Sequence, residues 1–281
     1  MISQNNYRPL FYFFTAFLVT YAFWFGGAYL SFQAQPGGLH MLLMLPGLMT
    51  PFVIALGLVV KAKNPQMRQD LRNRLTNLRL FRISSLPTFF LMMPLSVLLS
   101  ILLSLPFGGS LAQFQLAEEF SFSSGFVPVF LLLLLAATFE ELGWRGYAFD
   151  SLQSRFSYFK ASMIFSLLWS LWHFPLIFVK DSYQYEIFQN NIWFGVNFFI
   201  SIIPMGLLIS WICAKNGKSI LAAILFHLII NLSQEMLNIS QTTKCIQTVV
   251  LTIIAMGVIV WDKELFFSTR HLKKQSQKAA S

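Results

Sequence analysis

Long apolar runs separated by short polar segments set the pattern of this chain. Eight runs approach the ~20 residues that a helix needs to cross a bilayer; they cover residues 10–32, 39–60, 83–105, 126–148, 161–179, 192–213, 219–238 and 245–261. The runs are continuous, whereas the strands of a membrane barrel would alternate apolar and polar positions. The pattern therefore predicts an all-α polytopic membrane protein with about eight transmembrane helices, forming a single domain over residues 1–281.

Composition supports this prediction. The chain is 56% hydrophobic and only 11% charged, whereas soluble domains carry roughly 25% charged residues. The first apolar run is longer than the core of a signal peptide and lacks a small-residue cleavage site, so we expect it to be retained as a span. The two cysteines, Cys213 and Cys245, have no CxxC spacing and indicate neither a zinc cluster nor a disulfide framework.

The distribution of positive charge predicts the orientation. Of the 20 Lys and Arg residues, 17 fall on the side that holds both termini and the even-numbered loops, and two, Lys180 and Lys244, fall on the other. Cytosolic loops carry an excess of Lys and Arg. We therefore expect both termini to be cytosolic.

The loop over residues 61–82 is basic and has leucines at 71, 75 and 78. This helical spacing predicts either a segment that lies on the inner membrane surface against anionic lipid or a determinant of topology alone. Its basic residues lie next to the ends of spans, so we expect membrane lipid as a partner and no nucleic acid.

Few ionisable groups fall within the predicted spans, where such groups are costly and usually functional. They are Glu140, Glu141 and Arg145 in the fourth span, His173 in the fifth, and His227 and Glu235 in the seventh, which also carries the polar Asn231; Glu235 lies near the outer end of its span, where we expect it to be solvated or paired. At 1.5 Å rise per residue, Glu140, His173, His227 and Asn231 lie roughly 14, 18, 12 and 18 Å from the cytosolic ends of their spans. Three helices thus deliver polar groups to a similar depth.

Spacing within the fourth span separates its two acids. Adjacent helical residues point about 100° apart, so Glu140 and Glu141 cannot both face one site directly. Glu141 and Arg145 are four residues apart and can pair. Glu140 then remains the freer carboxylate, on a face that it shares with Trp144.

The same spacing recurs on the other two helices. Trp169 and His173 share one face of the fifth span, and His227 and Asn231 share one face of the seventh. We therefore expect Glu140 to meet His173, His227 and Asn231 in one polar site.

The three motifs, EE-x-x-x-R at 140–145, WSLWH at 169–173 and HLIIN at 227–231, together resemble the CAAX protease and bacteriocin-processing family. Within that family the chain is similar to the Ras-converting (type II) CAAX prenyl endopeptidases, including archaeal members. The motifs cover residues 140–231, and the eight-span layout extends the resemblance over nearly the whole chain. The second motif often begins with Phe in the family and begins here with Trp169, which keeps an aromatic residue at that position.

The resemblance implies proteolysis after the prenylated cysteine of a CAAX sequence. It implies that Glu140 and His173 activate water, that His227 and Asn231 stabilise the oxyanion, and that Glu141 and Arg145 support them. Trp144 and Trp169 are then candidates for the wall of the substrate pocket. The expected partner is a prenylated CAAX protein or peptide.

The residues themselves agree with water as the nucleophile. A buried carboxylate and an imidazole can activate water, and an imidazole and an amide can stabilise an oxyanion. No serine or cysteine stands in a recognisable nucleophile motif. Glu140, His173 and His227 could alternatively form a zinc site with an open position, although the chain has no HExxH motif. We favour a metal-free, glutamate-dependent hydrolase.

Two other classes of protein use buried Glu and His. A transporter or proton relay is one, but inverted repeats are not evident in the sequence; a non-catalytic membrane scaffold is the other. Within the protease class, a bacteriocin leader or another membrane peptide is the alternative substrate. The predicted location is the plasma membrane of a prokaryote or the endoplasmic reticulum membrane of a eukaryote, with the site open to the cytosolic side.

Overall fold

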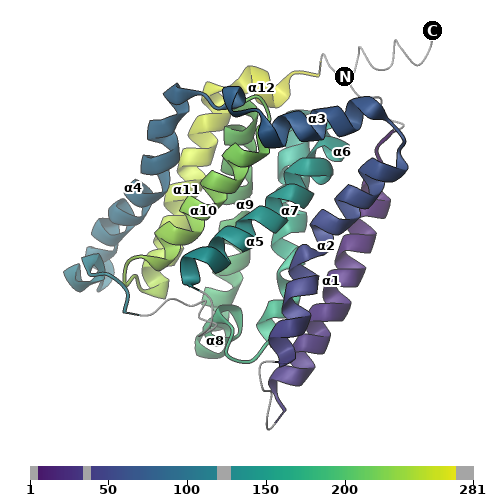
Figure 1. The fold of residues 1–281 in the computed structure, drawn as a ribbon. Helices are drawn as coiled ribbons and strands as arrows, with labels where there is room; N and C mark the ends of the chain where they lie inside the picture. The colour runs from purple at the N-terminus through teal and green to yellow at the C-terminus, as the bar shows by residue number, and fades with distance from the viewer. Residues whose placement is uncertain (1–5, 34–38, 119–127, 270–281) are drawn as a thin grey trace.

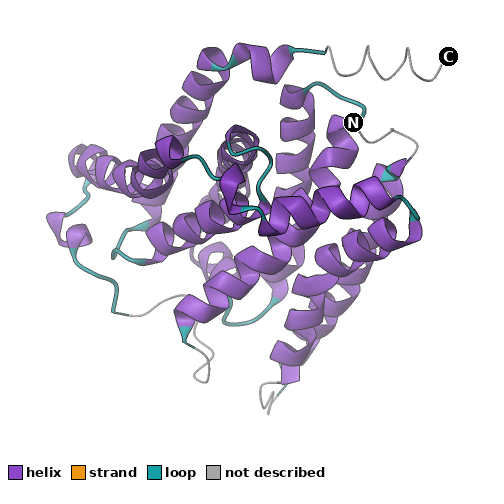
Figure 2. Ribbon diagram, turned by 45° about the horizontal axis from the view of Figure 1, so that its top comes forward, coloured by secondary structure: helices purple, strands orange, loops and turns teal. Residues whose placement is uncertain are grey.

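The computed structural model describes residues 6–33, 39–118 and 128–269, and within these ranges the chain is helical with no strand (Figure 2). One isolated antiparallel bridge joins Leu116 to Leu237. The prediction of an all-α polytopic membrane protein is confirmed. Residues 126 and 127, at the start of the fourth predicted span, lie outside the described residues.

Each of the eight apolar runs contains a long helix. In chain order these helices are α1 (Pro9–Ser31), α2 (Leu39–Lys61), α4 (Leu86–Ser104), α5 (Val129–Gly143), α7 (Tyr158–Trp172), α9 (Ile192–Lys215), α10 (Ile220–Glu235) and α11 (Gln241–Trp261). Six of these segments are long and apolar enough to cross a membrane, counting the 3-10 turns that extend α4 and α7. The other two, α5 and α10, have 15 and 16 residues, and α5 continues into further helical turns.

Shorter elements connect the long helices. They are α3 (Pro65–Thr76), α6 (Phe149–Gln153), α8 (Tyr183–Asn190) and α12 (Lys263–Phe267), the 3-10 turns η2 (Leu78–Leu80), η3 (Ile83–Ser85), η4 (Leu105–Phe107), η5 (Leu111–Phe114) and η7 (Phe174–Phe178), and the π-helical turn η6 (Trp144–Ala148).

The bundle has two helical pairs at its edges. Helices α1 and α2 pack together at one edge and α4 and α11 at the other, while α5, α7, α9 and α10 lie between them (Figure 1). Helix α5 contacts α2 on one side and α10 on the other, and α7 contacts α9. The three helices that carry the sequence motifs therefore lie in the middle of the bundle.

Helix α3 lies across one end of the bundle (Figure 1). Asn64 caps it, because its side-chain oxygen accepts the backbone N–H groups of Gln66 and Met67 at 3.0 and 3.3 Å, two of the groups that a helix N-terminus leaves unpaired. The helix buries Met67 and Arg74 and exposes Arg68, among others. The predicted helix in the basic loop is confirmed over residues 65–76, whereas Leu78 falls in the following turn.

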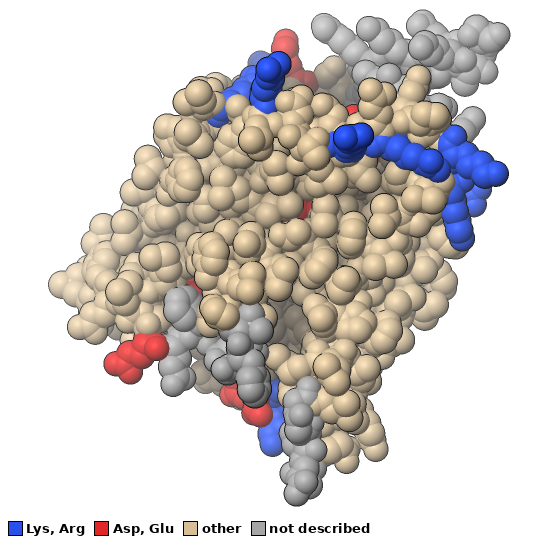
Figure 3. Space-filling model, viewed as in Figure 1, with Lys and Arg blue, Asp and Glu red and all other residues tan. Residues whose placement is uncertain are grey.

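Lys and Arg side chains gather at the end of the bundle that α3 covers, and the middle of this face is almost free of charge (Figure 3). Helix α12 and the start of α1 lie at the same end (Figure 1). This separation matches the charge pattern of the sequence. The cytosolic orientation of that end stays a prediction.

The fourth span is not a continuous α-helix. It changes to a π-helical turn at Trp144–Ala148, in which the N–H of Phe149 bonds to the carbonyl of Trp144, and then resumes as α6. Gly143, just before this turn, lies so close to α2 that an added Cβ would be 2.5 Å from the carbonyl carbon of Pro51. Such π-helical turns often occur at functional sites.

Candidate active site

Two adjacent carboxylates at the end of α5 form the centre of the polar site. Glu140 has 6% of its surface exposed, and Glu141 is fully buried. Helix α7 brings Trp169 and His173 to them, and α10 brings His227, which is also buried. The three sequence motifs therefore meet in space.

Glu140 is held by two indole groups. The Nε1–H of Trp169 donates to Oε2 of Glu140 at 2.7 Å, and the Nε1–H of Trp144 donates to the same oxygen at 3.4 Å. Within the described part of the chain, no side chain hydrogen-bonds the other oxygen, Oε1. One oxygen of the carboxylate is thus fixed by the protein and the other is left for a further partner.

Glu141 is held by two cationic or protonatable groups. Its Oε1 lies 3.0 Å from Nδ1 of His227, and its Oε2 lies 3.2 Å from Nη1 of Arg145. Arg145 also donates to Oγ of Ser210 at 3.3 Å, and its guanidinium carbon lies 4.3 Å from the ring centre of Phe165. The predicted pairing of Glu141 with Arg145 is confirmed, and His227 is an additional partner of the same carboxylate.

His173 lies at the C-terminal end of α7, where the α-helix changes to η7 just before Pro175. Its Nδ1 is 2.8 Å from the backbone oxygen of Trp169. A carbonyl oxygen only accepts hydrogen bonds, so we assign the proton to Nδ1. The neutral ring then presents Nε2 as a hydrogen-bond acceptor.

The indole ring of Trp169 lies between the two histidines. Its centroid is 5.3 Å from that of His227, with the planes nearly perpendicular, and 5.9 Å from that of His173. The same indole donates its N–H to Glu140 at 2.7 Å. The predicted convergence of Glu140 with the two histidines is therefore observed, with Trp169 placed among them.

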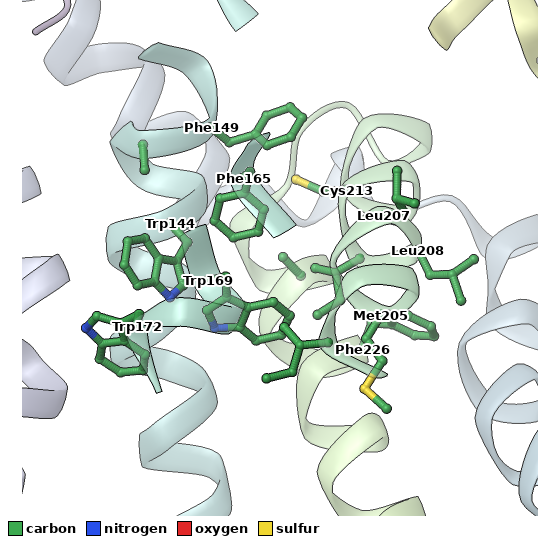
Figure 4. Close-up of a cluster of buried hydrophobic side chains, with 14 of the residues drawn as sticks. Trp144, Phe149, Phe165, Trp169, Trp172, Met205, Leu207, Leu208, Cys213 and Phe226 are labelled. Carbon is green, nitrogen blue, oxygen red and sulfur yellow. The ribbon is translucent and has the colours of Figure 1, made fainter. Parts of the chain in front are cut away.

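Other aromatic rings pack behind Trp169 (Figure 4). Trp144 contacts Trp172 and Phe165 with ring centroids 5.5 and 5.9 Å apart, and Phe165 stacks on Trp169 at 6.0 Å. Trp144 is fully buried. Its observed partner is the Glu140 carboxylate, so in this structure it supports the acid from behind instead of lining an open pocket.

Asn231 follows His227 by one turn of α10 and is partly exposed. No hydrogen bond of its side chain to another described residue is present. Its amide N–H group is thus available to a ligand, on the same helix face as the imidazole of His227.

Ser210 and Phe165 are site residues that the sequence analysis did not identify. Both contact Arg145, and neither is ionisable or part of a motif. The hydrogen bond between Trp144 and Glu140 was signalled by their spacing of four residues. The stronger bond from Trp169 joins two helices and had no signal in the local sequence.

The zinc alternative requires Glu140, His173 and His227 to point at one ion. Among the residues that the structure describes, no three His, Cys, Asp or Glu side chains are arranged to hold a metal.

A cavity of about 550 Å³ lies in another part of the bundle, lined by α1, η7 and α8 residues such as Phe25, Tyr29 and Phe188. It contains none of the predicted site residues.

Comparison with known proteins gives two results. Residues 122–233, which include all three motifs, match the Rce1-like family of type II CAAX prenyl endopeptidases. The chain is also 60% identical over 267 residues to the CAAX prenyl protease 2 of Methanococcus maripaludis, an alignment that covers 95% of this chain and 98% of that protein.

Proposed function

Because the chain belongs to the Rce1-like family of type II CAAX prenyl endopeptidases, we propose that this membrane peptidase removes the C-terminal tripeptide from prenylated CAAX proteins. The observation that carries the proposal is the meeting of α5, α7 and α10 at two buried carboxylates. Trp169 binds Glu140 at 2.7 Å, and His227 lies 3.0 Å from Glu141. In this proposal, two residues of the site supply hydrogen-bond acceptors and two supply donors.

The acceptor side consists of Glu140 and His173. The free Oε1 of Glu140 and the bare Nε2 of His173 can each accept a hydrogen bond from one water molecule. Removal of a proton from that water lets its oxygen attack the carbonyl carbon after the prenylated cysteine. Such positioned bases contribute roughly 10²–10⁴-fold to rate.

The donor side consists of His227 and Asn231. A carboxylate oxygen only accepts, so the Nδ1–H of His227 points at Glu141. Its Nε2 can then donate only when the ring is also protonated there. We assign His227 an imidazolium role: Glu141 stabilises the cation, and Nε2–H and the Asn231 amide donate to the developing oxyanion.

The reaction is completed without an acyl-enzyme intermediate. Collapse of the tetrahedral intermediate breaks the C–N bond, the amine of the released tripeptide takes the proton that His173 or Glu140 removed from water, and the prenylated cysteine keeps a new carboxylate. Arg145 limits the repulsion between two adjacent acids, because it neutralises Glu141 at 3.2 Å.

We further propose that substrate enters from the cytosolic side. Arg145 is adjacent to the basic end of the bundle, because its carbonyl accepts a hydrogen bond from Arg74 of α3. Glu141 is one helical turn further in, about 5–6 Å. The prenyl chain then lies in the bilayer while the peptide end reaches the site from the basic end. The similarity to a Methanococcus maripaludis protein supports the plasma membrane of a prokaryote over the endoplasmic reticulum membrane of a eukaryote as the location.

The test is cleavage of a farnesylated CAAX peptide and of its unprenylated twin by purified protein, with release of the tripeptide measured by mass spectrometry. We expect kcat/KM to be much higher for the farnesylated peptide, since the prenyl chain adds buried apolar surface worth roughly 0.8 kcal/mol per CH₂. Equal kcat/KM values for the two peptides would contradict a prenylated CAAX substrate and would indicate a membrane protease that cleaves another peptide.

A further inference from the structure

Arg74 of the surface helix α3 is buried beneath that helix, with 4% of its surface exposed. Its Nε lies 2.9 Å from Asp70 one turn earlier, and its Nη1 lies 2.9 Å from Asp150 of α6. Buried guanidinium groups require such partners, because an unpaired charge in the interior is costly. These two contacts alone would make Arg74 a stabilising residue of the fold.

Arg74 makes two more contacts, and these reach the catalytic helix. Its Nη1 donates to the backbone oxygen of Arg145 at 3.1 Å, and its Nη2 donates to that of Gly146 at 3.4 Å. Both carbonyls belong to the π-helical turn η6. The guanidinium thus binds the irregular turn that follows α5, the helix of Glu140 and Glu141.

The turn is coupled to the acids through the backbone and one ion pair. The N–H of Trp144, the first residue of η6, bonds back to the carbonyls of Glu140 and Glu141. Arg145 holds the Glu141 carboxylate. A displacement of η6 would therefore move the groups that fix both carboxylates.

The same cluster extends to the helix that carries the donor side of the site. Nζ of Lys218 lies 2.9 Å from Oδ1 of Asp150. Lys218 directly precedes Ser219, whose hydroxyl caps the N-terminus of α10. Arg74 and Asp150 together join α3, η6, α6 and the start of α10.

The cluster and the Glu141–Arg145 pair are close to each other. Residues of both line one cavity of about 10 Å³, among them Arg74, Arg145, Asp150 and Ser210. This volume is close to the minimum for one water molecule. We therefore expect a displacement of Arg74 to displace Arg145 as well, because little empty space lies around the two side chains.

We infer that Arg74 is a positioning residue for peptide hydrolysis: by binding the carbonyls of η6 and pairing with Asp150, it holds the acid pair of α5 in register with His227 of α10. The inference rests on the proposed function of these residues. A purely structural role is the alternative, in which the ion cluster stabilises the fold and the site tolerates its loss.

The experiment compares three variants with the full-length protein in detergent, using the farnesylated CAAX peptide. Arg74→Ala removes all four contacts. Arg74→Lys keeps the charge and can reach Asp150, but a single ammonium cannot reproduce the fork of the guanidinium. Arg72→Ala is the matched control, since it removes one exposed positive charge from the same helix.

We expect Arg74→Ala and Arg74→Lys to lower kcat by roughly tenfold to a hundredfold, with KM changed much less, because small misplacements of reacting groups are costly. Arg72→Ala should retain the kcat of the unmodified protein. Guanidinium ion at millimolar concentration should restore part of the kcat of Arg74→Ala. If Arg74→Ala does not fold, the kcat of Arg74→Lys alone tests the positioning role of Arg74.

Three results would overturn the inference: an unchanged kcat in Arg74→Lys, a kcat in Arg74→Ala equal to that of Arg72→Ala, or a loss of rate that follows only the fraction of folded protein. Glu140→Ala is assayed alongside. If Glu140→Ala is inactive and Arg74→Lys is fully active, Arg74 has no positioning role but the proposed catalytic site stands. If Glu140→Ala is active, the proposed catalytic role of Glu140 is wrong, and the inference about Arg74 loses its basis.

Discussion

Oε1 of Glu141 lies 3.0 Å from Nδ1 of His227, and this contact joins the acid motif of α5 to the histidine motif of α10. The second oxygen of the same carboxylate faces Arg145 at 3.2 Å. Glu141 is therefore shared between a permanent cation and a protonatable ring. In the proposed mechanism, Glu141 sets both the orientation and the charge of the His227 imidazole, which donates to the oxyanion.

Replacement of Glu141 by its amide should show separately how much the orientation of His227 and the charge of His227 contribute to catalysis. In Glu141→Gln the amide oxygen can still accept from Nδ1–H, but it no longer stabilises an imidazolium. We expect kcat for the farnesylated peptide to fall by about a hundredfold, the magnitude for loss of one oxyanion donor, with KM nearly unchanged. Full activity in folded Glu141→Gln would show that His227 does not act as a cation.

Trp169→Phe tests the hydrogen bond that fixes Glu140. The ring and its contacts with the histidines are largely kept, but the 2.7 Å bond to Oε2 is lost. Hydrogen bonds to charged groups contribute roughly 1.5–3 kcal/mol, so we expect kcat to fall at least about tenfold. Trp211→Phe is the control, because its indole N–H is bonded to Asp262 and not to Glu140. Equal kcat values in the two variants would contradict a role of Trp169 in positioning Glu140.

Acid should weaken the cluster at the basic end of the bundle. Asp150 lies beyond the end of the fourth span; its burial acts to raise its pKa, but the charges of Arg74 and Lys218 outweigh this and hold the pKa below the ordinary value of 3.8. Because the folded-state pKa is the lower one, the stabilisation is present above pH 3.8 and is lost as pH falls through the folded value.

The measurement is thermal unfolding in detergent between pH 7 and pH 3. At pH 7, Asp150→Asn should destabilise the protein by roughly 3 kcal/mol, since it leaves Arg74 buried with one carboxylate fewer. Below pH 3.8 the gap between the two proteins should narrow. A constant gap over the whole range would show that ionised Asp150 does not contribute to stability.

Removal of metal should leave activity intact. The proposed mechanism activates water with Glu140 and His173, so dialysis against a strong chelator is expected to leave kcat unchanged. The metal content of the dialysed protein is measured at the same time by mass spectrometry. Loss of cleavage that zinc alone restores would replace this mechanism with a zinc-dependent one.

Periodicity and local spacing were sufficient to predict part of this structure. The eight apolar runs coincide with the long helices because burial in lipid requires continuous apolar segments whose backbone groups bond internally. The pair Glu141–Arg145 followed from helical geometry, since residues four apart are neighbours on any α-helix. Trp144 beside Glu140 followed from the same rule.

The similar depths of Glu140, His173 and His227 predicted that their three helices meet, but most individual side-chain contacts between helices could not be predicted from periodicity and spacing. Arg74 looked like one more basic residue of a surface loop, yet it is buried and binds two carbonyls of η6. The close packing of Gly143 against α2, just before the π-helical turn, likewise joins two helices and has no signal in the local sequence. The position of His173 at the end of α7, instead of within a continuous span, reflects Pro175, which lacks the N–H that a helix would need.

The most direct test of the central claim is cleavage of a farnesylated CAAX peptide by purified Glu140→Ala protein beside the unmodified chain, with folding verified for both. If Glu140 activates the attacking water, kcat should fall by roughly 10²–10⁴-fold while the peptide still binds. Cleavage by folded Glu140→Ala at a rate within a fewfold of the unmodified protein would contradict the assignment of Glu140 as the catalytic acid–base residue.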